Sequence, residues 1–191
     1  RGGAAGECAL FAGDGAGAVA SLCSLMRAEG NALATLRLGG NGAWPEGGGA
    51  SLVSALGASS CVVEELDVSG SGLKAADAAA LVGACGSLKT LTLGEWAMPV
   101  AELRAGEAVA TGGKAVGEAE GAVVGELLKA NGALTSLDLS GSACAGAALK
   151  LIGEGLGGSA APLAELLLGG VTHGEGEASV ASRLAAMVGG A

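Results

Sequence analysis

Few residues in this chain have the types and spacing that catalysis requires. The single histidine, His173, is the only base available to a serine–histidine–acid arrangement, and no Gly-x-Ser-x-Gly turn stands beside a matching strand pattern. We expect His173 to be a packing residue of a terminal repeat. The carboxylates are spread along the chain, and no pair is set apart by its spacing. The sequence therefore predicts no catalytic residues and no metal site, and we expect a protein that is not an enzyme.

One glycine pattern could bind phosphate. Gly13-x-Gly15-x-x-Ala18 precedes a helical pattern and fits the dinucleotide fingerprint, in which glycines let a pyrophosphate approach a helix N-terminus. The same glycines fall in the bend of an in-phase repeat, and the chain contains 38 glycines, so accidental matches are frequent. We therefore predict no cofactor, and a dinucleotide-binding enzyme stays as the last alternative.

The five cysteines do not describe a disulfide framework. Their number is odd and no paired spacing recurs among them. We interpret them as buried free thiols that act as small apolar residues, with metal ligation or redox sensing as the alternatives. Reduced cysteines favour a reducing intracellular compartment, and an organelle reached after removal of a targeting segment is the second option.

A recurring sequence pattern, here called the phrase, predicts the secondary structure of the chain. Its first clear copy is Leu33-x-x-Leu36-x-Leu38-x-x-Asn41. Apolar residues at offsets 0, +3 and +5 predict a short strand whose alternate side chains turn inward. The phrase begins again at Val63, Leu88, Leu134 and Leu163, and degenerate copies begin at Ala5 and Gly106. The repeat units therefore start near residues 5, 33, 63, 88, 106, 134 and 163.

A second apolar pattern, at helical spacing, follows the strand phrases. Val19, Leu22, Leu25 and Met26 form one such stripe, and residues 123–128 contain another. Strand, turn and helix repeated at this period predict an α/β solenoid in one domain, residues 1–191, with parallel strands on the concave face and helices on the convex face. Residues 97–114 are irregular, and there a proline-containing connection replaces a helix, so we expect the helical layer to be broken.

The phrase Leu134-Thr-Ser-Leu137-Asp-Leu139-Ser-Gly-Ser142 resembles the leucine-rich repeat of the ribonuclease-inhibitor type, and the resemblance covers roughly residues 5 to 188. The family's asparagine survives only at Asn41, with Ser71 and Ser142 as hydrogen-bonding substitutes. The resemblance implies a horseshoe arc and protein–protein binding, usually through the concave face.

Charge and hydropathy exclude two classes of partner. A net charge of −9 with only 10 basic residues argues against a nucleic-acid surface, and no charge-free run has the hydrophobicity of a membrane span. The hypothesis is therefore a non-enzymatic protein-interaction or scaffolding module. The alternative is an architectural accessory subunit of a larger complex, organellar or membrane-associated, because mean hydropathy is +0.56 and an apolar stripe at residues 180–188 has no polar cap.

The position of each residue within its repeat is enough to predict the candidate contact residues. Side chains at strand offsets +2 and +4 face away from the inward leucines, and the bends after two strands carry the only tryptophans. Tryptophan and arginine dominate the energy of many interfaces. The candidate partner-binding residues are Arg37, Trp44, Glu65, Asp67, Trp96, Asp138 and Glu165.

Overall fold

The computed structural model describes residues 15–58 and 61–171 of the chain. Over these residues the fold is mixed α/β with parallel strands, which confirms the class expected from the sequence. The elements in chain order are α1 (Gly15–Arg27), β1 (Thr35–Arg37), α2 (Gly48–Leu56), β2 (Glu65–Asp67), α3 (Ala75–Ala84), β3 (Thr90–Thr92), β4 (Ala97–Pro99), α4 (Val100–Ala105), β5 (Ala108–Ala110), α5 (Glu118–Ala130), β6 (Ser136–Asp138), α6 (Gly146–Gly158) and β7 (Glu165–Leu167).

Every parallel strand begins two residues after the start of a phrase, and its middle residue points into the protein. Leu36, Leu66 and Leu91 are aligned across β1, β2 and β3, and all three are buried. Val109 and Leu137 are aligned across β5 and β6 in the same way. In-register stacking places equal offsets side by side, so the core forms a row of apolar side chains behind the strands.

A glycine with a left-handed backbone follows most strands. The residue at offset +7 is a glycine with φ between 70 and 76°. A residue with a Cβ adopts this left-handed conformation only with strain. These glycines are Gly40, Gly70, Gly113, Gly141 and Gly170. The unit that starts at Leu88 has Glu95 at this offset instead. The chain after β3 therefore lacks the residue on which the other turns depend.

The chain after β3 folds back as a hairpin instead of following the other turns. β4 pairs antiparallel with β3, with Leu91 opposite Met98 and Thr90 opposite Pro99. The order β1-β2-β3-β4 forms one sheet, and β5-β6-β7 forms a second. Pro99 has no N–H group to offer a further strand, which suits a position at a sheet edge. The irregular segment thus divides the strands into two sheets.

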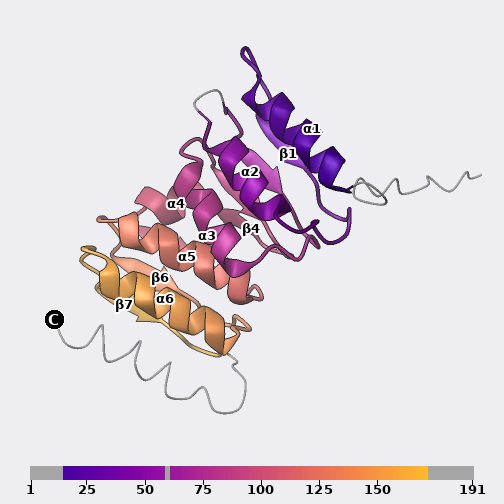
Figure 1. The fold of residues 1–191 in the computed structure, drawn as a ribbon. Coiled ribbons are helices and arrows are strands. Elements are labelled where there is room, and N and C mark those ends of the chain that lie inside the picture. The colour runs from indigo at the N-terminus through magenta and orange to yellow at the C-terminus, as the bar shows by residue number, and fades with distance from the viewer. Residues whose placement is uncertain (1–14, 59–60, 172–191) are drawn as a thin grey trace, which may run out of the picture.

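The helices lie side by side along one side of the strands (Figure 1). α1 contacts α2, α2 contacts α3, α3 contacts α5, and α5 contacts α6. The expected break in the helical layer is therefore wrong, because α3 and α5 meet directly across the irregular segment. The interruption falls in the strands, where β4 occupies the edge of β3. The short α4 fills the remaining space and contacts β3, β5 and α5.

Burial identifies the inward face of each helix. In α1 the buried residues Val19, Cys23 and Met26 share one face, whereas Leu25 is 56% exposed, so the predicted stripe is wrong at that position. α5 and α6 approach so closely that a Cβ added at Gly125 would meet the backbone of Leu151. Glycine at this position therefore lets the two helix backbones touch.

Within the part of the chain that the structure describes, no helix is both long and apolar enough to cross a bilayer.

Candidate interaction surface

Side chains at offsets +2 and +4 of β2 and β3, with the offset +4 side chain of β1, surround a shallow hollow of about 370 Å³. Alternation along each strand turns these side chains away from the buried leucines. We call this the strand-face hollow, and its lining residues are Arg37, Glu65, Leu66, Asp67, Thr90, Thr92 and Ala97. Three of the residues predicted from the sequence, Arg37, Glu65 and Asp67, therefore lie together. Five of the seven lining residues are polar or charged, and buried Leu66 also contributes to the lining.

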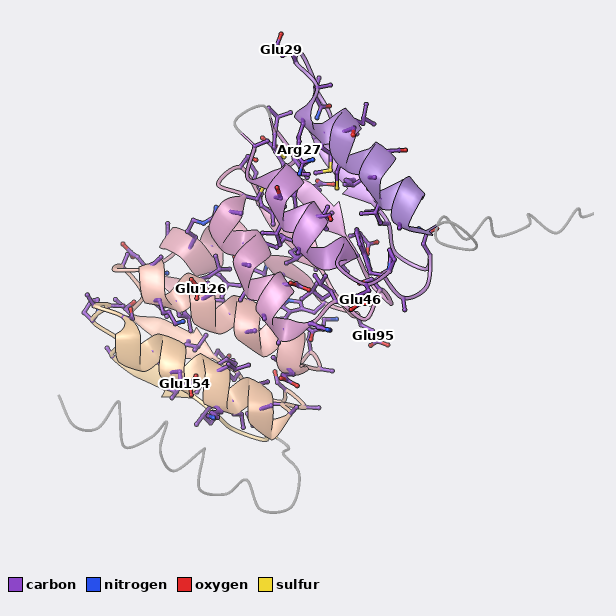
Figure 2. The ribbon with its side chains drawn as sticks, viewed as in Figure 1. Arg27, Glu29, Glu46, Glu95, Glu126 and Glu154 are labelled. Atoms are coloured by element: carbon purple, nitrogen blue, oxygen red, sulfur yellow. The ribbon has the colours of Figure 1, made fainter. Side chains whose placement is uncertain are left out.

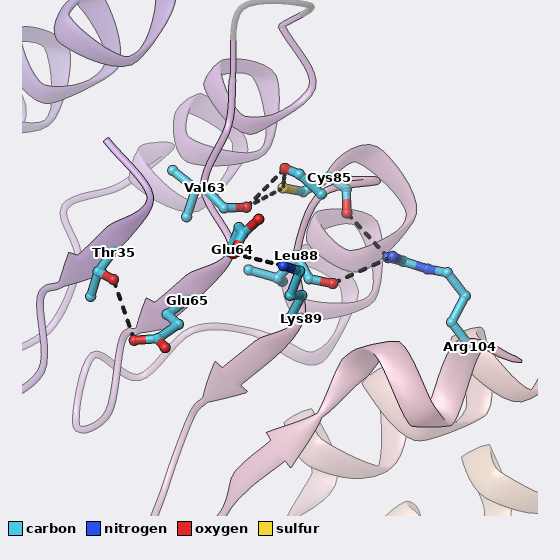
Figure 3. Close-up of polar contacts among 9 residues, drawn as sticks. Thr35, Val63, Glu64, Glu65, Cys85, Leu88, Lys89 and Arg104 are labelled. Atoms are coloured by element: carbon cyan, nitrogen blue, oxygen red, sulfur yellow. Dashed lines mark hydrogen bonds and ion pairs between the residues drawn. The ribbon is translucent and has the colours of Figure 1, made fainter. Parts of the chain in front are cut away.

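Both carboxylates of the hollow are held in place by hydrogen bonds. The Thr35 hydroxyl donates to Glu65 Oε2 over 3.3 Å, which Figure 3 shows at the exposed side of β1 and β2. The backbone N–H of Ser69 donates to Asp67 Oδ1 over 2.9 Å. Each bond engages one carboxylate oxygen, so each acid keeps further acceptor capacity. The Asp67 bond also stabilises the turn that follows β2.

Arg37 faces the hollow from β1 and is the only basic residue that lines it. It is aligned with Asp67 in the parallel register, and its side chain is exposed. Among the described residues, however, no carboxylate lies within ion-pair distance of its guanidinium. The hollow therefore presents one cation beside two acids, with the hydroxyls of Thr90 and Thr92 opposite.

Asp138 and Glu165 lie on the second sheet and repeat the same local bonds. The Ser136 hydroxyl donates to Glu165 Oε2 over 2.9 Å, and the Ser140 N–H donates to Asp138 Oδ1 over 2.8 Å. Hydrogen bonds from the Ser140 hydroxyl and backbone amide lower the pKa of Asp138 below its usual range. These two acids are not part of the strand-face hollow, so the candidate residues fall into separate groups.

Neither of the two tryptophans predicted as partner-binding residues is exposed. Trp96 is 6% exposed and belongs to the apolar core, in the loop that joins β3 to β4. Trp44 is half-buried and packs against the core, and its backbone N–H donates to the Ser71 carbonyl over 3.1 Å. Trp96 is therefore a core residue and not a contact residue on the surface.

Ala97 is the lining residue that sequence reasoning missed. It enters the hollow because β4 folds back along β3, with Ala97 aligned to Thr92. The available signal was Glu95, which stands where the other turns have a left-handed glycine. Thr90 and Thr92 did follow from their strand offsets.

The remaining predictions concern residues with no site in the described region. The described residues contain no group of three or more His, Cys, Asp or Glu side chains that could hold a metal ion. Gly13 of the dinucleotide pattern, His173, the strand phrase that starts near residue 5 and the apolar stripe at 180–188 lie outside the described residues.

Two acidic side chains on the helix side, Glu126 and Glu154, form ion pairs within their own helices. Figure 2 shows Glu126 on α5 and Glu154 on α6, away from the strands. Glu126 pairs with Lys129 at 3.0 Å and Glu154 with Lys150 at 3.8 Å, and the four side chains are between 41 and 71% exposed. Exposed pairs of this kind contribute roughly 0 to 1 kcal/mol to stability. The helix side therefore offers matched controls for charge changes on the strands.

No protein-family model and no curated protein matches the chain. Among solved structures, the chain is similar to leiomodin-1 actin-binding site 2 (ABS2), with 12% identity and a TM-score of 0.33. The alignment covers 88% of this chain and 86% of that chain. A similarity of this strength carries no inference about partner or activity.

Proposed function

We propose that the chain is a non-enzymatic protein-binding module, built as a solenoid of leucine-rich repeats of the ribonuclease-inhibitor type. The repeated strand offset, the left-handed glycine at +7 and the continuous row of helices support this architecture. The convex helices and the concave strands of such a solenoid leave the strand face as the surface for a partner.

The strand-face hollow is the observation on which the choice of surface depends. It brings together exposed and half-buried polar side chains from successive strands, and Leu66 is the one core residue in its lining. Such a surface suits an extended polypeptide whose side chains alternate between the hollow and solvent.

Charge indicates the chemistry of the partner. The hollow presents Glu65 and Asp67 against one arginine, and the whole chain carries a net charge of −9. A partner segment with lysine or arginine beside serine or threonine complements two carboxylates and two threonine hydroxyls. We therefore expect a basic segment of another protein to bind along β1, β2 and β3.

Fluorescence anisotropy with two labelled peptides tests this proposal. One peptide alternates lysine with serine, and its counterpart alternates glutamate with serine. The chain should bind the lysine peptide, and Glu65→Gln or Asp67→Asn should each weaken binding roughly two- to fivefold, as expected for one exposed charge pair. Asparagine at 67 can still accept the Ser69 N–H, so the turn is retained.

The matched control is Glu154→Gln, which makes the same charge change on α6. Equal weakening by Glu154→Gln would mean that net charge alone attracts the peptide, and this would overturn the proposed surface. Equal binding of the glutamate peptide would do the same.

The architectural alternative has one observation in its favour. On β7, Leu166 is only half-buried and Leu167 is 39% exposed, whereas Leu137 on β6 is fully buried. An accessory subunit would cover this apolar end with a neighbour. Light scattering on the purified chain in reducing buffer distinguishes the two: self-association favours the subunit, and a stable monomer favours the module.

A further inference from the structure

The two acids of the strand-face hollow lean from β2 toward β1 and end on either side of Arg37. Glu65 Oε2 accepts the hydroxyl of Thr35, two residues before Arg37, over 3.3 Å (Figure 3). The Asp67 carboxylate lies against Gly39, two residues after Arg37. A Cβ added at Gly39 would stand 2.8 Å from Asp67 Oδ1 and 3.0 Å from its Oδ2. The charges along β1 therefore follow the order negative, positive, negative.

The pairing of the two chains continues past the end of β1, so these three positions are evenly spaced. The Leu38 N–H donates to the Asp67 carbonyl over 2.6 Å, and the Gly40 N–H donates to the Ser69 carbonyl over 3.0 Å. Alternate residues of an extended chain lie about 6.6 Å apart and point to the same face. An extended partner segment laid over β1 and β2 has the same repeat, so its alternate side chains each meet one of the three charges.

Arg37 is open to an acid from a partner. Its side chain is exposed and lines the hollow, and within the described chain no carboxylate lies at ion-pair distance from it. The bonds of Glu65 to Thr35 and of Asp67 to the Ser69 N–H direct both carboxylates to either side of the arginine. A partner carboxylate can therefore bind the guanidinium without breaking an ion pair within the chain.

The two acids each have a threonine beside them on β3. Thr90 is aligned with Glu65, and Thr92 is aligned with Asp67. A lysine ammonium carries three donors, so one lysine can bond to a carboxylate oxygen and to a neighbouring hydroxyl. The hollow thus offers two places for a base, with one place for an acid between them.

We propose that the strand-face hollow selects an extended partner segment that carries base, acid and base at alternate positions, with the acid on Arg37 and the bases on Glu65 and Asp67. This inference rests on the proposed function and adds the order of charges to it, with Arg37 as the residue that determines specificity. The order reads the same from either end, so the segment can run in either direction along β1. A segment with bases at all three positions places one of them against Arg37, where like charges repel.

Fluorescence anisotropy with three labelled peptides of equal length tests this order. Their cores are Lys-Ser-Glu-Ser-Lys, Lys-Ser-Lys-Ser-Lys and Glu-Ser-Lys-Ser-Lys, each flanked by serines. The first should bind roughly three- to tenfold more tightly than the second, because an attraction replaces a repulsion at one exposed position. Attraction by net charge alone predicts the reverse, since the second peptide is the most positive and the chain carries a net charge of −9. The third should bind roughly two- to fivefold more weakly than the first, because with its acid on Arg37 only one of its bases meets a carboxylate.

Variants at Arg37 show whether this residue determines the preference. Arg37→Gln should remove the advantage of Lys-Ser-Glu-Ser-Lys over Lys-Ser-Lys-Ser-Lys, and Arg37→Glu should reverse it. Because Arg37 is exposed, both variants are expected to fold, which thermal unfolding checks. Lys150→Gln removes one positive charge from α6 and is the matched control, so it should leave the advantage unchanged.

The outcomes separate this inference from the proposed function. If no peptide binds, or if Glu154→Gln weakens binding as much as Glu65→Gln, the proposed function fails and the inference fails with it. If Lys-Ser-Lys-Ser-Lys binds through Glu65 and Asp67 but Lys-Ser-Glu-Ser-Lys binds no more tightly, the proposed function stands and the inference is overturned. An advantage that survives Arg37→Gln overturns the inference as well.

Discussion

Asn131 binds the backbone on either side of Arg104. The Asn131 carboxamide donates to the carbonyls of Leu103 and Gly106 over 3.1 and 3.0 Å, while the Arg104 guanidinium donates to carbonyls at the C-terminal end of α3, including Val82 over 3.0 Å. Arg104 thus joins α4 to α3, and Asn131 joins α4 to the end of α5. These two side chains fasten the irregular segment into the stack.

Replacing Asn131 by alanine should lower the free energy of unfolding by roughly 3 kcal/mol, because two carbonyls and the Ala133 N–H lose their bonds at a site that is 1% exposed. Urea denaturation measures the change. Asn31→Ala is the matched control, since the half-buried Asn31 side chain bonds to the backbone of Met26 and Leu33, and we expect about 1 kcal/mol there. Equal losses at the two positions would contradict the bridging role of Asn131.

Arg104→Ala should expose the last turn of α3. The guanidinium also bonds to the carbonyls of Cys85 and Gly86 over 3.1 and 2.9 Å, so its removal leaves the end of the helix without a cationic cap. We expect a loss of about 1 to 2 kcal/mol and faster hydrogen exchange at the Cys85 amide. Arg104→Lys should recover less than half, because an ammonium group cannot span the same carbonyls. Lys114→Ala controls for charge and should leave exchange in α3 unchanged.

Gly125→Ala should destabilise the contact between α5 and α6 by about 2 kcal/mol, because the new Cβ meets the Leu151 backbone, which cannot rotate away. Thermal unfolding measures the loss. The control is Gly83→Ala on α3, where a Cβ has no neighbour within 4 Å. The better helix propensity of alanine should raise stability there by about 0.5 to 1 kcal/mol. A neutral result at Gly125 would show that the two helices separate easily.

The ionised Asp138 carboxylate should stabilise the folded state, and this contribution should disappear at acidic pH. Its pKa is lowered in the folded state by the Ser140 hydroxyl and amide, so the contribution is present above the unfolded pKa and is lost as pH falls through the folded pKa. The stability difference between wild type and Asp138→Asn should therefore shrink from about pH 4 downward. An NMR titration should also show the Asp138 pKa rising in Ser140→Ala. A difference that grows on acidification would have the wrong sign.

The repeated positions of the fold could be predicted because burial and backbone geometry recur at fixed offsets. Leu66 and Leu137 are buried at offset +3, as the alternation of side chains requires. The degenerate phrase that starts at Gly106 also forms a strand, because β5 begins two residues later as in the other repeats. Val109 and Thr111 are the buried residues at its inward positions. In-register stacking also brought Arg37 beside Asp67, so part of the candidate surface followed from phase alone.

The irregular segment could not be predicted from periodicity. β4 has three residues and includes Pro99, so neither its length nor its pattern distinguishes it from a loop. Its direction depends on the turn at Glu95 and on the burial of Trp96 and Met98, which are tertiary effects. The bonds that Arg104 makes to the end of α3 could not be predicted either, because the bonded residues do not occupy equivalent positions in the repeat. Binding of a basic partner stays a prediction.

The division of the strands into two sheets has a consequence for how the two halves of the molecule are coupled. Within each sheet, neighbouring units share backbone hydrogen bonds, whereas the pairing of strands stops at β4 and resumes at β5. Across that boundary, coupling passes through the contact of α3 with α5 and through the side chains that anchor α4. The two halves are therefore coupled by helix packing and side-chain bonds, so a change at that boundary acts on their coupling without touching the pairing of any strand.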